Sequence, residues 1–175
     1  GLPVVPPTQS RVMAMLEGTT RFADENLGLM PSNLDVYTVE KVAINAVMAG
    51  CRPEYLPVVL AAIEAVLDED YCLHGTLATT RFVGPVVIVN GPIAQHIGMN
   101  GKGNALGQGN RANATIGRAV QLAIRNIGGG KPQGVDRATL GNPGKLSYCF
   151  CEDEEGSSWE PLTIDRGLPA GTNAV

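Results

Sequence analysis

Cysteine is the residue type of this chain best suited to covalent chemistry, and Cys51 lies between two predicted helices. A thiol at the start of a helix beside an arginine, here Arg52, has its thiolate favoured, because the peptide dipoles and the positive charge stabilise the anion. The thiolate is the form that attacks carbon or sulfur and binds metal ions. We therefore expect Cys51 to be a nucleophile or a ligand. The alternative is a small buried residue that fills a tight helix junction.

Two further cysteines, Cys149 and Cys151, alternate along a predicted strand, so that their thiols point to the same side. Such a pair can bind metal or take part in redox chemistry. The chain lacks a paired C-x-x-C or a histidine at zinc-like spacing, so the cofactor stays open, with a metal ion or an iron–sulfur cluster as candidates. The acidic run 152–155 is typical of a solvated turn, with a general base as the alternative.

Each of the two histidines, His74 and His96, stands alone in the sequence. Either can serve as a base or a ligand, although a hydrogen-bonded structural histidine is the commoner case. We keep His74 with Cys51 and Cys149 as the candidate catalytic residues.

A glycine-rich stretch precedes a predicted helix, with five glycines in residues 98–109. Glycines let backbone N–H groups turn toward one point, and a helix start adds unpaired donors. This composition predicts a loop that binds phosphate or carboxylate, the alternative being a loop without function. It matches neither a Walker A loop nor a dinucleotide fingerprint. The candidate substrate-binding residues are Lys102, Gly107, Gly109, Asn110, Arg111, Asn113 and Thr115.

These residues need helices and strands to position them. Apolar periodicity and capping residues predict helices over 8–17, 39–49, 53–67 and 113–127, with Thr38 and Asn113 as N-caps and Gly50 as a C-terminal glycine. Pro57 indicates a kink or the true start of its helix. Apolar runs predict a fully buried strand over 86–89 and a last strand over 145–151, while residues 18–37 are expected to form a loop.

The combination of predicted helices and strands indicates an α/β or α+β fold. We expect a single domain over 1–175 with buried helices around a small sheet. Arg111, Arg118 and Arg125 fall on one stripe of the last helix, typical of a solvated face that can also guide an acidic partner. The net charge of −4 argues against nucleic acid as a partner, and the longest apolar run is too short to span a membrane. The four cysteines could form two disulfides, but a chain of this size with a full core rarely needs them, which favours a reducing cytoplasm.

Four long segments, residues 38–66, 89–100, 107–119 and 141–162, resemble the UGSC family of (seleno)proteins, and the likeness extends over about residues 2–167. That family is named after a (selenocysteine or cysteine)-Gly-Ser-Cys motif, which implies thiol or selenol chemistry. The motif does not occur in this chain. Because it precedes a region like this one in the family, the resemblance implies a C-terminal half or a separate subunit, with the motif on a partner subunit or N-terminal half.

The leading hypothesis is a thiol-based enzyme domain or subunit that acts on a small anionic substrate, with Cys51 as nucleophile or ligand. One alternative is a lyase or hydratase subunit in which cysteines or a histidine hold a metal or cluster. Another is a non-catalytic subunit that binds a small anion.

Overall fold

Seven α-helices and two small sheets make up the part of the chain that the computed structural model describes, residues 2–30 and 35–175. The helices pack around the sheets, which confirms the expected α/β or α+β class. Within the described ranges, no helix combines the length and apolar character needed to cross a membrane. The helices are α1 (Gln9–Leu16), α2 (Val39–Ala49), α3 (Leu56–Leu67), α4 (Leu73–Ala78), α5 (Pro92–His96), α6 (Arg111–Asn126) and α7 (Leu162–Asp165).

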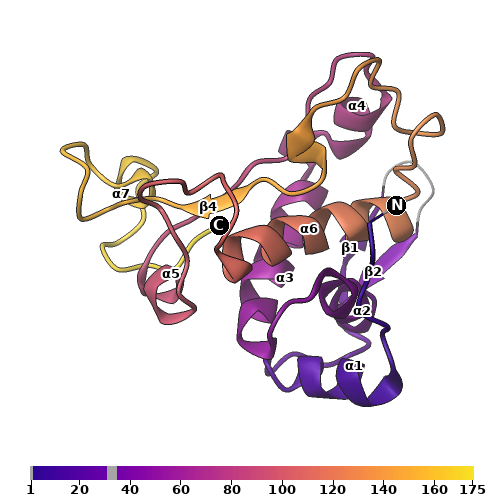
Figure 1. Cartoon of the computed structure of the whole chain (residues 1–175), viewed down its shortest axis with the longest axis horizontal. Helices are drawn as coiled ribbons and strands as arrows, with labels where there is room; N and C mark the ends of the chain where they lie inside the picture. Colours follow the sequence, from indigo (N-terminus) through magenta and orange to yellow (C-terminus); the bar gives the residue numbers. More distant parts are fainter. Residues whose placement is uncertain (1, 31–34) are drawn as a thin grey trace.

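The packing of α2 against α6 forms the centre of the core, and α6 also contacts α3 and a strand (Figure 1). Helix α2 starts and ends as the sequence predicts: the Thr38 side chain accepts from the N–H of Lys41, and Gly50 has a φ of 90°, which favours glycine. Each helix presents a fully buried apolar stripe to the other, made of Val39, Val42, Ala43 and Ala46 from α2 and of Ile116, Ala119, Val120 and Ala123 from α6.

Helix α3 follows a 3-10 turn, Pro53–Tyr55, and has Pro57 in its first turn. Of the two possibilities for Pro57, the true helix start is the one observed, because a proline there has no helical hydrogen bond to lose. The acidic residues after α3 are exposed, as expected, and the Asp68 side chain accepts from the N–H of Asp70 at 2.9 Å.

The first sheet pairs β1 (Asn26–Leu29) with β2 (Val36–Thr38) in antiparallel fashion. The prediction of a loop over 18–37 is wrong for these residues, because the pairing joins two short segments that carry no strong strand pattern of their own. The turn-forming residues Pro31, Ser32 and Asn33 lie outside the described residues.

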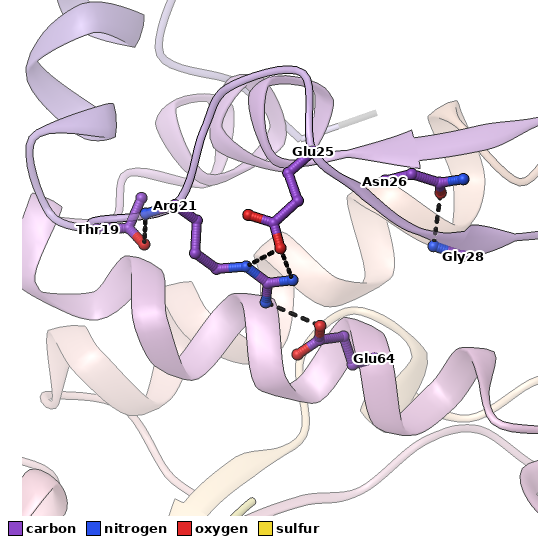
Figure 2. Close-up of polar contacts among 6 residues, drawn as sticks. All are labelled: Thr19, Arg21, Glu25, Asn26, Gly28 and Glu64. Atoms are coloured by element: carbon purple, nitrogen blue, oxygen red, sulfur yellow. Dashed lines mark hydrogen bonds and ion pairs between the residues drawn. The ribbon is translucent and has the colours of Figure 1, made fainter.

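The loop before β1 is tied to α3 through a single arginine (Figure 2). Arg21 donates from Nε and Nη2 to Glu25 Oε1 at 3.0 and 2.8 Å, and its Nη1 lies 2.8 Å from Glu64 Oε1. The hydrogen bond to Arg21 lowers the pKa of Glu25 and raises that of the arginine. These side chains are partly exposed, so we assign the cluster a structural role in holding the loop against α3.

The second sheet pairs β3 (Val87–Val89) with β4 (Cys149–Cys151) in parallel, with Val87 opposite Cys149 and Val89 opposite Cys151. The predicted strands were longer than these, because residues 143–145 form a 3-10 turn instead. The prediction of a fully buried strand over 86–89 is wrong as well: Val87 and Val89 are buried, but Val86 is 46% exposed. A two-stranded sheet covered on one face buries only alternate residues.

Strand β4 lies directly on α6 at Gly117. A Cβ at this position would lie 2.6 Å from Ser147 Oγ, 2.8 Å from Tyr148 N and 3.0 Å from Cys149 Cβ. Only a residue without a side chain permits this approach. Ser147 strengthens the contact, because its Oγ donates to the carbonyl of Ala114 at 2.8 Å.

We expect Gly117→Ala to lower the free energy of unfolding by about 1–3 kcal/mol, although alanine is the better helix former by about 1 kcal/mol. The added methyl group would push β4 away from α6. Urea denaturation followed by circular dichroism measures the effect. Gly103→Ala is the matched control, since nothing lies within 4 Å of a Cβ there. Equal stability of the two variants would contradict the close contact.

Candidate functional site

Cys51 lies at the junction between α2 and α3, against the first turns of α6. Its Sγ donates to the carbonyl of Thr115 at 3.3 Å, and the thiol is buried. The guanidinium of Arg111 donates to the carbonyl of Gly50 at 3.0 and 2.9 Å. Two residues that the sequence marks as functional, Arg111 and Thr115, thus tie this junction to α6.

The expectation that the Cys51 thiolate is favoured is wrong for this chain. Burial raises the pKa of the Cys51 thiol to about 12, and the contact with Thr115 and the charge of Arg111 lower it by less. Arg52 does not stabilise the Cys51 thiolate, because its guanidinium is exposed and lies 3.7 Å from Glu54. The free-energy cost of desolvating the thiolate is larger than the stabilisation from nearby positive charge, so the neutral thiol is the stable form.

Cys149 and Cys151 are both buried, and the predicted shared orientation of their side chains on one strand is confirmed. The pKa of Cys149 is raised to about 12, mainly by burial and to a smaller extent by the nearby Cys151 and Cys51. Burial also raises the pKa of Cys151. Thiols from two distant parts of the sequence, Cys51 and the pair Cys149 and Cys151, therefore lie near one another, and burial favours the neutral form of each.

The glycine-rich loop is held onto α6 by side-chain amides. Asn113 donates to the carbonyls of Asn100 and Ala105 at 2.8 and 3.1 Å and accepts from the N–H of Asn100 at 3.1 Å. Asn110 donates to Gly98 O at 2.8 Å and accepts from the N–H of Asn113 at 2.9 Å. The N-cap of α6 is thus Asn110, not Asn113 as predicted, and Asn113 is instead buried within the helix.

A cavity of about 440 Å³ opens between this loop, the first turn of α6 and the segment that leads into β4. It brings together three of the predicted site residues, Gly107, Asn113 and Cys149. Within the described part of the chain, no charged side chain lines it. The complete lining is Ala105, Leu106, Gly107, Asn113, Ala114, Asn142, Pro143, Gly144, Ser147, Tyr148 and Cys149.

The other predicted binding residues do not line this cavity. Lys102 is exposed and lies 3.8 Å from Asp153, while the Thr115 hydroxyl donates to the carbonyl of Arg111 at 2.8 Å. Gly109 and Asn110 belong to the end of the loop that leads into α6. These residues shape or anchor the loop, and the cavity itself is formed by their neighbours.

His74 lies on α4, away from Cys51 and Cys149. Leu77 of the same helix packs against Gly130, which is just beyond the C-terminal end of α6. Cys51 contacts α6 at Thr115, and the 11 residue steps from there to Asn126 span about 17 Å at 1.5 Å per residue. The structure therefore does not bring His74, which is exposed, together with Cys51 and Cys149 (Figure 1).

The acidic run after β4 organises a neighbouring loop, a role that the sequence pattern did not reveal. Asn90, only 2% exposed, donates to both Glu152 and Glu154. Glu154 also accepts from the N–H of Gly91 at 2.6 Å, and Glu152 accepts from that of Leu162 at 2.9 Å. A polar residue directly after the buried strand β3 was the available signal for Asn90.

No group of three histidine, cysteine, aspartate or glutamate side chains in the described ranges is arranged to hold a metal ion. No protein-family model, curated protein or solved structure matches this chain.

In the native chain, we expect iodoacetamide at pH 7.5 to modify Cys72 first, because it is the exposed cysteine. Cys51 and Cys149 should react at least about 30-fold more slowly, since burial disfavours the thiolate and blocks access. Peptide mass spectrometry of the time course measures each rate, and the same reaction in urea supplies the control. Modification of Cys51 as fast as Cys72 would contradict this assignment.

Alkaline pH should destabilise the fold through the same thiols. Between about pH 8.5, the usual pKa of cysteine, and pH 12, the unfolded chain releases protons that folded Cys51 and Cys149 retain. The free energy of unfolding then falls by up to about 1.4 kcal/mol per pH unit for each thiol. Urea denaturation between pH 8 and 10.5 should show a shallower decline for Cys51→Ala, whereas Cys72→Ala should follow the wild type.

Proposed function

We propose that this chain is the small-molecule-binding domain or subunit of a thiol-based enzyme, with its substrate in the cavity at the start of α6. One observation carries the proposal: three segments that the sequence marked separately meet there. They are the glycine-rich loop at Gly107, the first turn of α6 at Asn113 and the cysteine strand at Cys149. A volume of about 440 Å³ suits a small metabolite.

The first turn of α6 supports a substrate with a carboxylate or phosphate group. The helix dipole places partial positive charge at this end of α6. The cavity lies beside Asn113 and Ala114, whose own N–H groups already donate to Asn110, so the dipole rather than free N–H groups supports the anion. No acidic side chain among the described lining residues opposes an anion. Ala114, exposed in the first turn, leaves room for a ligand to approach the backbone.

Cys149 is the thiol that we assign to the substrate, in place of Cys51. It lines the cavity, whereas Cys51 lies against Thr115. A thiol with a pKa of about 12 must lose its proton before it can attack. We assign the acceptor of that proton to the partner subunit or N-terminal half that the UGSC resemblance implies. The proposal includes a reducing cytoplasm, where these free thiols persist.

A non-catalytic subunit that binds a small anion is the second candidate. The raised pKa values of Cys51 and Cys149 favour it, because neutral buried thiols are chemically inert. The metal-dependent lyase has no comparable support, since the described residues gather no set of three metal ligands.

The test of the binding site is Ala114→Glu, with Ala114→Gln as the matched control. The probes are inorganic phosphate and succinate, followed by NMR shifts of the Gly107 and Ala114 amides in the full chain. Wild type and Ala114→Gln should bind at least one probe, and Ala114→Glu should bind about tenfold more weakly or worse, because its carboxylate repels the anion. Glutamate in the first turn favours the helix, so unfolding is not the expected cause.

If neither probe shifts these amides in the wild type, the anion site is absent. The thiol assignment has its own test in the full assembly. Cys149→Ser should abolish turnover and retain phosphate binding. Unchanged turnover would leave the chain as a binding subunit.

A further inference from the structure

A second and larger cavity, of about 700 Å³, lies at the other end of α6. It is enclosed by the last turns of α6, by α4 and by the glycine-rich segment 130–146, which runs across the top right of Figure 1. Leu77 and Ile124 are buried in its wall, and Leu140 and Leu146 are largely exposed at 85% and 59%. The cavity therefore offers an apolar surface large enough for a small ligand.

Among the described residues, the positive charge of Arg125 at this cavity has no partner. Lys145 and Asp136 neutralise each other, with Nζ and Oδ1 2.7 Å apart and both side chains mostly buried. Arg125 also lines the cavity and is exposed, and its guanidinium makes no hydrogen bond or ion pair with any other residue in the described ranges. Gln121 lies one turn earlier on the same face of α6 and adds an amide.

We propose that this cavity is a binding site for a small amphipathic anion. The apolar body of the ligand packs against Leu77 and Ile124. Its carboxylate, sulfonate or phosphate group pairs with the guanidinium of Arg125, whose fork of N–H donors matches two oxygens of such a group. The neutral ion pair of Lys145 and Asp136 holds the wall in place and leaves the site with net positive charge.

This site is separate from the one assigned to the substrate. The two cavities share a wall at Asn142 and Pro143, and no cysteine lines the second one. Asn142 itself is anchored, since its amide donates to the carbonyl of Phe82. The inference goes beyond the proposed function and does not depend on Cys149 or on the first turn of α6.

The test compares 2-naphthoate with 2-naphthamide, which have the same apolar body and differ in charge. Both are titrated into the full chain, followed by NMR shifts of Ile124 and Leu140. We expect naphthoate to bind the wild type about fivefold or more tightly than the amide. Arg125→Gln should remove this preference, and Arg125→Lys should retain part of it. Arg137→Gln is the matched control, because Arg137 is exposed on the same segment and does not line the cavity.

Three results would overturn the proposal: no binding of either compound, a preference for naphthoate that survives in Arg125→Gln, or shifts confined to Gly107 and Ala114 in the first cavity. Ala114→Glu should leave naphthoate binding unchanged. The result of the naphthoate test is thus independent of the result of the phosphate test, so that each of the two proposed sites can be disproved without affecting the other.

Discussion

The close approach of β4 to α6 at Gly117 is the contact on which the candidate site depends. Without a side chain at that position, the backbone at Tyr148 and the Cβ of Cys149 can lie against the helix, and Ser147 bonds to the carbonyl of Ala114. The position of strand β3 depends on the same contact, because β3 pairs with β4 in parallel. Cys149 thereby reaches the stretch of α6 that Cys51 contacts through Thr115. The same approach forms one wall of the smaller cavity.

The packing that gathers the thiols also keeps them protonated. A thiolate needs solvation or nearby positive charge, and burial removes the first. Arg111 is the nearest source of the second, but its guanidinium is bonded to the carbonyl of Gly50, and its charge lowers the pKa of Cys51 by less than burial raises it. The raised pKa values of Cys51 and Cys149 therefore favour the neutral thiols over the reactive thiolates. Under the proposed function, the group that accepts the proton belongs to the partner half.

The two cavities differ in how they present charge to a ligand. At the start of α6, the described lining has no charged side chain, and the positive end of the helix dipole is the source of positive potential. At the second cavity, near the C-terminal end of α6, the side chain of Arg125 supplies the positive charge. Seventeen of the 22 glycines lie at or after Gly84, and many of them belong to the loops that wall the two cavities. Gly107 and Gly144 line the first cavity and Gly130 and Gly141 the second, where glycine permits the turns and close contacts of these loops.

Local signals in the sequence were sufficient for the four longer helices, α1, α2, α3 and α6, whereas the short helices α4, α5 and α7 were not predicted. Thr38 and Gly50 bound α2 as predicted, and the apolar periodicity of α2 and α6 identified the faces that form the core. The shared side of Cys149 and Cys151 also followed from strand geometry alone. The pairing of β1 with β2 could not be predicted from the sequence, because strand pairing depends on partners that short segments do not specify. The cap of α6 was misplaced by three residues, since Asn110 and Asn113 both suit an N-cap and only the buried loop contacts of Asn113 separate them.

The sequence was sufficient for the four longer helices, the residue types of the site and the glycine-rich loop, because these depend on backbone preferences and on neighbours within a turn. Only the tertiary structure decided the state of the thiols and the place of each charge. Cys51 and Thr115 are 64 residues apart, and the pKa of Cys51 follows from the desolvation that this distant packing imposes. Arg52 is adjacent in sequence and lies next to Glu54 at the surface. Burial is a property of the whole fold, so no local pattern could show that it outweighs the positive charge beside the thiol.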